Sequence, residues 1–255
     1  MDYKEDFYMV LTSNLFNSEY PDNKPSHFIT PLARPLELDK ESWRCGLSEI
    51  TFPHSWSNID GIQCDINLYK NIKTQPTTYD KITIPPGFYR RVADVCNKLN
   101  SIININISKK QTHASFEYNN QNDTVTLRVN ENRKLIINKQ LSMKLGFDIN
   151  IFTNGIYIGN RSADIHYDTH HFFVYSNVIN EIPVGNSYVK LLRTVPTLED
   201  TSERYITKIF DKPHYMNIAS SFENVIEIGI TTDEGTYFNF RSGKVIITLH
   251  FIKTK

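Results

Sequence analysis

The sequence has few cysteines and no excess of charge of either sign. Cys45, Cys64 and Cys96 are odd in number and far apart, and no CxxC pair occurs. This spacing argues against a disulfide framework or a zinc ribbon and is typical of a reducing compartment. The 28 basic residues are balanced by 28 acidic residues. Because proteins that bind nucleic acid usually carry a basic excess that neutralises phosphates, we expect no specific nucleic-acid partner.

Long apolar runs are also missing from the chain. No run approaches the roughly 20 residues that a membrane helix needs. The first six residues, MDYKED, are rich in charge and contain no apolar signal region. We therefore expect a soluble protein that is made inside a cell and is not inserted in a membrane.

Aromatic residues, in contrast, are abundant, with 14 Tyr and 15 Phe in 255 residues. Together with isoleucine and threonine they suit half-buried pleated surfaces, so the composition favours β-structure. Hydrophobic residues make up 40% of the chain, which is enough to bury a core. The length exceeds the roughly 100 to 150 residues of one sandwich and fits a sandwich with an inserted domain.

The last thirty residues carry the strongest strand pattern. Apolar residues alternate with other residues in Val225–Thr231, Tyr237–Phe240 and Lys244–Ile252. Segments 233–235 and 241–243 each contain a glycine and predict turns. We therefore predict three consecutive strands joined by tight turns, as at the end of an all-β sandwich.

Two earlier segments predict particular features of a sheet. In Trp43–Pro53 the apolar residues change from odd to even positions, so we predict a β-bulge near Ser48-Glu49 that keeps both sets on the core side. His27–Leu38 contains two prolines, which restrict it to an edge strand at best.

The middle of the chain, residues 61–165, has a different character. Apolar residues recur at three- and four-residue steps over Val92–Ile103 and predict a helix. Residues 113–129 predict a hairpin, and Gln140–Leu145 predicts a short helix that ends at Gly146. A β block, a mixed block and a second β block indicate one sandwich interrupted by an insertion; the alternative is two sequential domains divided near residues 150–165.

The best candidate for a metal site is segment 166–171. On a strand, His166, Asp168 and His170 would lie on one side, and imidazole with carboxylate suits zinc or iron. A cupin-like metalloenzyme would use His166, His170 and His171, but no glutamate follows His171 at a suitable spacing. A polar stretch that leads into a strand explains the segment more simply. We therefore predict no metal, no cofactor and no catalytic residue.

Two further candidates also have simpler structural explanations. Arg90 and Arg91 precede the predicted helix and would hold an anion at its N-terminus. The segment lacks the glycines of a phosphate loop, so the first turn of a helix is the preferred interpretation. Phe52, His54 and Trp56 would form an aromatic cage or lectin-like site; alternatively, Phe52 and Trp56 fill the end of the sandwich core.

Several groups of segments occur in a recognisable order. The first group is Phe7–Asn14, Tyr20–Asn23 and His27–Thr30; the second is Leu36–Leu38, Trp43–Ile50 and Phe52–Trp56; the third is Ile84–Tyr89 and Lys98–Asn100. Phe173–Asn177, Gly185, Leu191–Arg193 and the closing strand Gly243–Phe251 fit the same pattern. Together they resemble the minor capsid (penton) proteins of Polinton/Maverick elements, adintoviruses and related virophages. The match covers most of the chain and is weakest over about 105–165.

The resemblance implies a mainly β fold, a single jelly-roll sandwich interrupted by an α+β insertion domain. The jelly roll would span residues 1–60 and 166–255, with the insertion domain over 61–165. It further implies a non-enzymatic structural protein, with five copies closing an icosahedral vertex. Such a protein would contact a double-jelly-roll major capsid protein and reside in the virion. It would be made in the host cytoplasm and assembled there, in the nucleus or in a viral factory.

For the subunit contacts of such a ring we predict residues near Trp56 and the loop Pro213-His214-Tyr215, with the segment before Phe7 reaching a neighbouring subunit. One alternative function is a carbohydrate- or receptor-binding jelly-roll module, with a ligand-sized pocket and exposed aromatic residues on the insertion. A host surface receptor or glycan is compatible with both functions. The other alternative is the cupin-like metalloprotein.

Overall fold

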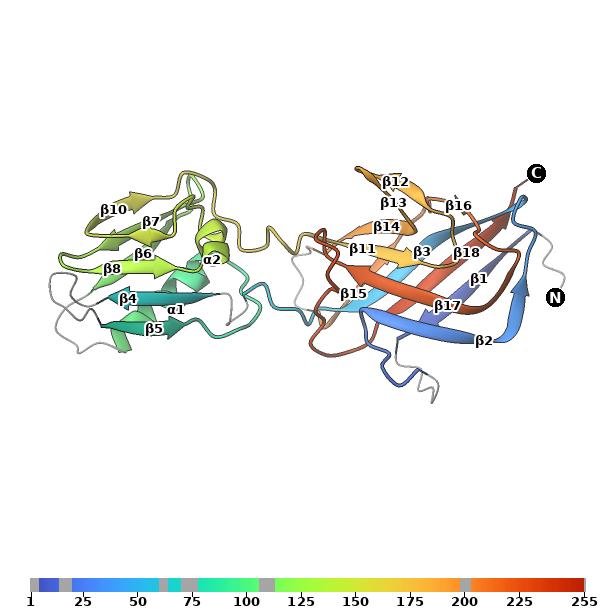
Figure 1. Cartoon of the computed structure of the whole chain (residues 1–255), viewed down its shortest axis with the longest axis horizontal. Helices are drawn as coiled ribbons and strands as arrows, with labels where there is room; N and C mark the ends of the chain where they lie inside the picture. Colours follow the sequence, from blue (N-terminus) through green and yellow to red (C-terminus); the bar gives the residue numbers. More distant parts are fainter. Residues whose placement is uncertain are drawn as a thin grey trace. The chain divides into compact units, whose positions relative to one another are not determined.

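The computed structural model describes residues 5–13, 20–59, 64–69, 78–105, 113–197 and 203–254. The chain forms two compact units, each of which is described by itself (Figure 1). Unit 1 combines Met1–Trp56 with Thr169–Lys255, and unit 2 is Ser57–Asp168. Most of the segment before Phe7, predicted to reach a neighbouring subunit, lies outside the described residues.

Unit 1 is built from antiparallel strands. They are β1 (Asp6–Thr12), β2 (His27–Glu37), β3 (Trp43–Pro53), β11 (His171–Ser176), β12 (Ile182–Val184), β13 (Ser187–Val189), β14 (Leu191–Pro196), β15 (Tyr205–Ile209), β16 (Met216–Asn217), β17 (Phe222–Thr231) and β18 (Ile246–Lys253). One sheet has the order β1-β18-β3-β15, with β16 also paired to β3, and another has the order β14-β11-β17-β2. Strands β12 and β13 form a separate hairpin.

The order of the strands defines the fold. The two main sheets of unit 1 contain eight strands, which can be numbered one to eight in chain order: β1, β2, β3, β11, β14, β15, β17 and β18. In these numbers the sheets have the orders 1-8-3-6 and 5-4-7-2. Except for the consecutive strands 4 and 5, neighbours in each sheet are not consecutive in sequence, which is the pattern of the two Greek keys in a jelly roll. The predicted jelly-roll sandwich is confirmed. Unit 2 lies in the connection from the third of these strands to the fourth.

The predicted β-bulge is present in β3. Thr248 of β18 pairs with Glu49, and the next residue, Leu249, pairs with Leu47, which leaves Ser48 as the extra residue. The buried side chains before and after the bulge all face the core: Trp43, Cys45, Leu47, Ile50 and Phe52. One inserted residue thus keeps both sets of apolar positions inside.

Two expectations about strands have different outcomes. Strand β2, with its two prolines, lies at the end of its sheet, as predicted. The prediction of a middle strand over Tyr237–Phe240 is wrong. This segment contributes only a bridge from Tyr237 to Thr231, while Phe238 and Phe240 are buried. The alternation reflects two phenylalanines inserted into the core from an irregular connection.

Unit 2 is an α+β unit. Its elements are β4 (Asp65–Tyr69), β5 (Tyr79–Thr83), α1 (Val92–Ile105), β6 (Ala114–Asn119), β7 (Thr124–Val129), β8 (Lys134–Ile137), α2 (Lys139–Lys144), β9 (Ile151–Phe152) and β10 (Gly155–Ile158). They form the sheets β5-β4-β8-β9 and β10-β7-β6. Both predicted helices and the predicted hairpin are present. Gly146, which follows α2, has a φ of 85°, a left-handed conformation that ends the helix there.

Among the described residues, no helix is long and apolar enough to cross a membrane.

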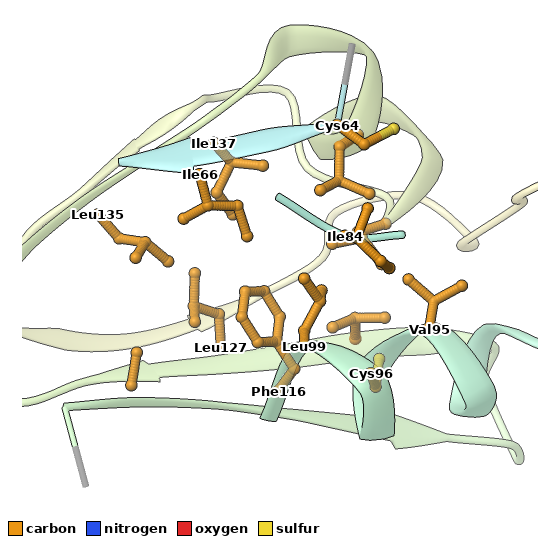
Figure 2. Close-up of a cluster of buried hydrophobic side chains, with 14 of the residues drawn as sticks. Cys64, Ile66, Ile84, Val95, Cys96, Leu99, Phe116, Leu127, Leu135 and Ile137 are labelled. Atoms are coloured by element: carbon orange, nitrogen blue, oxygen red, sulfur yellow. The ribbon is translucent and has the colours of Figure 1, made fainter. Parts of the chain in front are cut away.

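The apolar face of α1 builds the core of unit 2. Val95 and Leu99 reach into a cluster that includes Ile66 and Ile84 (Figure 2). Each such side chain contributes roughly 1.5 to 3 kcal/mol when fully buried. Two hydrogen bonds also connect the helix to β6. The side-chain amide of Asn100 accepts from the backbone N–H of Phe116 and donates to the backbone oxygen of the same residue, at 2.8 Å each.

The three cysteines are buried and form no disulfide. Burial raises the pKa of the Cys96 thiol to about 12 and that of the Cys45 thiol further. These two thiols are therefore protonated at neutral pH and serve as small core side chains rather than nucleophiles.

Lys144, the last residue of α2, joins the two ends of unit 2. Its side chain is 4% exposed, and its Nζ donates to the backbone oxygen of Asn58 at 2.6 Å and to Oδ1 of Asp168 at 2.7 Å. A third acceptor is the backbone oxygen of Ile165, at 3.4 Å. One ammonium group thus holds the residues where the chain enters and leaves the unit.

Replacing Lys144 tests this connection. We expect Lys144→Ala to lower the free energy of unfolding by roughly 2 to 4 kcal/mol, because it leaves buried acceptors without a donor. Urea unfolding followed by circular dichroism measures the change. The matched control is Arg161→Ala, which removes an ion pair to Asp148 at 2.6 Å that is about half exposed and costs less than about 1 kcal/mol. Equal losses in the two variants would contradict the role of Lys144.

Candidate functional site

The loop predicted to make subunit contacts lies on the outer face of the sheet β1-β18-β3-β15. Its Tyr215 hydroxyl lies 2.8 Å from Nδ1 of His250 in β18, and Nε2 of His250 lies 3.0 Å from Oδ2 of Asp6 in β1. The ring of Tyr8 stacks on the His250 ring with centroids 4.1 Å apart. His250 thereby joins the edge strand β1 to the loop before β16.

The loop can approach the sheet because β3 has a glycine opposite His250. Gly46 pairs with His250 in the ladder between β3 and β18. A Cβ atom at Gly46 would lie 2.8 Å from the backbone oxygen of His214 and 3.1 Å from Cβ of Pro213. Sequence reasoning missed this residue, although an isolated glycine within a strand signals close approach of another backbone.

The hydrogen bonds around His250 define a consistent protonation pattern. An imidazole that carries its one proton on Nε2 donates to the Asp6 carboxylate and accepts from the Tyr215 hydroxyl at Nδ1. Burial, and then the nearby Tyr8, Asp6 and Cys45, raise the pKa of Tyr215. The hydroxyl therefore keeps its proton and can donate it to Nδ1. The arrangement fixes positions and holds no nucleophile.

The same face carries exposed apolar side chains on an open strand edge. Tyr8 is 60% and Val10 65% exposed, and His214 is also exposed. In the described part of the chain β1 pairs only with β18, so its other edge offers unpaired backbone groups. We name Tyr8, Val10, Pro213 and His214 the contact surface. Aromatic residues at an edge of this kind are typical of protein–protein interfaces.

Trp56, the other predicted contact residue, requires a correction. Its side chain is 3% exposed and packs at 5.7 Å from the Phe238 ring and 6.4 Å from the Phe240 ring, within unit 1. The indole ring has almost no surface to offer a partner. Phe52 and Trp56 fill the core, as the simpler interpretation predicted, and do not form an aromatic cage.

The candidate metal ligands do not lie on a strand, so the shared side that a metal site would need is missing; the segment leads into a strand, as the simpler interpretation predicted. His166 and Asp168 lie in a turn over residues 165–169, and β11 begins only at His171. Asp168 is paired with Lys144, and Nδ1 of His166 lies 3.2 Å from the side-chain nitrogen of Asn58. Over the described ranges, no group of three or more His, Cys, Asp or Glu residues could hold a metal ion. His170 belongs to unit 1, whereas His166 and Asp168 belong to unit 2.

The two arginines before α1 are exposed, as expected for residues at the start of a helix. Arg91 pairs with Asp94 of the first turn at 3.0 Å, and this hydrogen bond raises the pKa of the Arg91 guanidinium. One of the two charges is therefore already paired within the helix. Arg90 and Arg91 also line a cavity of about 580 Å³ together with Tyr118 and Asp164.

The solved structures that are similar to this chain include two from virophages. The mavirus penton protein, in a crystal structure of its selenomethionine-labelled form, matches with a TM-score of 0.51 and 11% identity, over 98% of this chain and 100% of that chain. A chain in the cryo-electron microscopy structure of the Sputnik virophage matches with a TM-score of 0.51 and 9% identity, over 98% of both chains. The chain has the fold of a virophage penton protein. The resemblance inferred from the sequence is confirmed at the level of the fold. No protein-family model and no curated protein sequence matches the chain.

Because the loop lies directly against Gly46, replacing this glycine by alanine should destabilise the protein more than the same change at Gly229. We expect Gly46→Ala to lower the free energy of unfolding by about 1 to 3 kcal/mol, because the methyl group would overlap the His214 backbone. At Gly229, in β17, an added Cβ would meet no atom closer than 3.8 Å, so Gly229→Ala should be nearly neutral. Chemical denaturation of both variants measures the difference, and a neutral Gly46→Ala would refute the close approach.

The bond from Tyr215 to His250 predicts a second, smaller effect. Tyr215→Phe keeps the ring and removes the donor to a buried Nδ1, so we expect a loss of about 1 kcal/mol in unfolding free energy. Tyr188→Phe, at an exposed tyrosine of β13, is the control and should leave stability unchanged. Thermal unfolding of the three proteins measures the shifts. Identical melting temperatures would show that the bond contributes nothing.

Proposed function

We propose that the protein is a penton, a minor capsid protein without catalytic activity that closes the vertices of an icosahedral virion as a homopentamer. The observation that carries the proposal is the match of fold to the mavirus penton protein over 98% of this chain and the whole of that protein. Such a match includes both the jelly roll and the inserted unit, so it is more specific than a shared jelly roll alone.

The contact surface supplies what a closed ring needs. A five-fold ring uses a heterologous interface, in which one patch meets a different patch of the next copy. The contact surface, with Tyr8 and Val10 exposed on an open strand edge, serves as one of the two patches. Equal numbers of acidic and basic residues keep the electrostatic cost of packing several copies together low.

The remaining assignments follow from this role. The protein resides in the virion, at the vertex, where it contacts a double-jelly-roll major capsid protein. It is made in the host cytoplasm and assembled there, in the nucleus or in a viral factory. Unit 2 corresponds to the insertion domain expected over residues 61–165.

The mass of the purified protein in solution tests the proposal. Native mass spectrometry should give a fivefold multiple of 29.7 kDa, alone or after addition of the major capsid protein. Val10→Lys, which places a charge on the contact surface, should shift the mass toward the monomer. Phe222→Lys, at an exposed aromatic residue of β17 in the other sheet, is the matched control and should leave the pentamer intact.

Two outcomes would contradict the penton role. A trimer would indicate a receptor-binding jelly roll instead. A monomer that also fails to associate with the major capsid protein would leave the protein without a place at the vertex.

A further inference from the structure

Unit 2 contains a polar pocket that the penton role does not use. Its volume is about 640 Å³, and it lies where His113, just before β6, meets the end of β7 and the start of β10. Val129 of β7 pairs with Ala114 of β6 on one side and with Gly155 of β10 on the other. The strand ends therefore lie in one row, and the turn after Val129 borders them (Figure 1).

One arginine of the pocket is held in place by a buried histidine. Nε of Arg133 donates to Nδ1 of His113 at 2.6 Å, and His113 is buried. Because arginine stays protonated, Nδ1 must be the acceptor, so the imidazole is neutral with its proton on Nε2. Arg133 makes no other side-chain hydrogen bond or ion pair within the described residues. Its position is thus fixed through Nε, while the two terminal nitrogens keep their donors.

The second arginine of the pocket is only weakly paired. Arg128 is 51% exposed, and its partner is the exposed Glu117 carboxylate at 3.9 Å, the limit of an ion pair. The residues that line the pocket include these two arginines and one acidic residue, Glu131. A carboxylate ligand that binds both arginines would form charge-assisted hydrogen bonds, the strong class for this pair of groups.

The rest of the lining suits a sugar ring. The side-chain amide of Asn154, which also lines the pocket, has both a donor and an acceptor for hydroxyl groups. Ile156, whose side chain is largely exposed, offers a small apolar surface for the carbon–hydrogen face of a ring. A few polar groups around a small apolar contact are typical of sites for small polar ligands.

We propose that this pocket binds an acidic saccharide, with Arg128 and Arg133 as the ligands of its carboxylate and the Asn154 amide as a ligand of its hydroxyl groups. The ligand class is a sugar that bears a carboxylate, such as a uronic acid or a sialic acid. The site lies wholly within unit 2, so it does not depend on how copies of the chain assemble.

Two glycosides that differ only at one carbon test the proposal on the full chain. Methyl β-D-glucuronide carries the carboxylate, and methyl β-D-glucoside carries a hydroxymethyl group in its place. Saturation-transfer difference NMR should detect the glucuronide and give at least a tenfold weaker apparent affinity for the glucoside. 3′-Sialyllactose and lactose provide a second pair with the same difference in charge.

Two arginine variants locate the site. Arg128→Gln should weaken glucuronide or sialoside binding about tenfold or more, as expected for loss of one charge-assisted hydrogen bond. Arg161→Gln removes an arginine of unit 2 that is similarly exposed but lines another cavity, and it should leave binding unchanged. Because Arg128 is exposed, both variants should keep the circular dichroism spectrum and melting temperature of the parent.

Three results would overturn the inference. They are the absence of binding to both carboxylated probes, equal affinity for the members of each pair, and unchanged binding in Arg128→Gln. None of them concerns the mass of the assembly, so the saccharide site and the penton role succeed or fail separately.

Discussion

The hydrogen bonds of one buried lysine hold together the two ends of unit 2. Lys144 places the backbone oxygen of Asn58 and the carboxylate of Asp168 at 2.6 and 2.7 Å from the same nitrogen. A domain whose ends lie together can be accommodated in a connection of another fold without separating the strands on either side. This allows the jelly roll to continue from β3 to β11 with 112 residues of unit 2 between its two parts. Because a buried ammonium group is costly to leave unpaired, Lys144 favours the arrangement in which the two ends of unit 2 lie together.

A second constraint acts on the outer face of unit 1. The absence of a side chain at Gly46 lets the backbone of His214 lie directly on β3, and His250 then bonds both to this loop and to β1. The edge strand and the loop consequently form one continuous surface, with Tyr8 and Val10 exposed beside it. The close packing at Gly46 and the two hydrogen bonds of His250 hold this surface in place before a partner binds. Binding then costs little conformational entropy, which suits a protein that assembles in many identical contacts.

The sequence predicted the elements whose determinants are local. The change of apolar parity around Ser48 was sufficient to predict the bulge, and the spacing over Val92–Ile103 was sufficient for α1. Residues whose role depends on distant segments could not be placed in this way. Trp56 is buried because Phe238 and Phe240, nearly two hundred residues away, insert beside it, and those two residues imitate a strand without forming one. The pocket of unit 2 likewise exists only where three strand ends meet.

The central claim is that this chain closes capsid vertices. The most direct measurement is cryo-electron microscopy of particles assembled from this protein and the major capsid protein. The account predicts five copies of the jelly roll around each five-fold axis, with Tyr8 and Val10 inside the contact between neighbouring copies. Particles whose vertices close without this chain, or a ring in which the edge of β1 faces solvent, would contradict it.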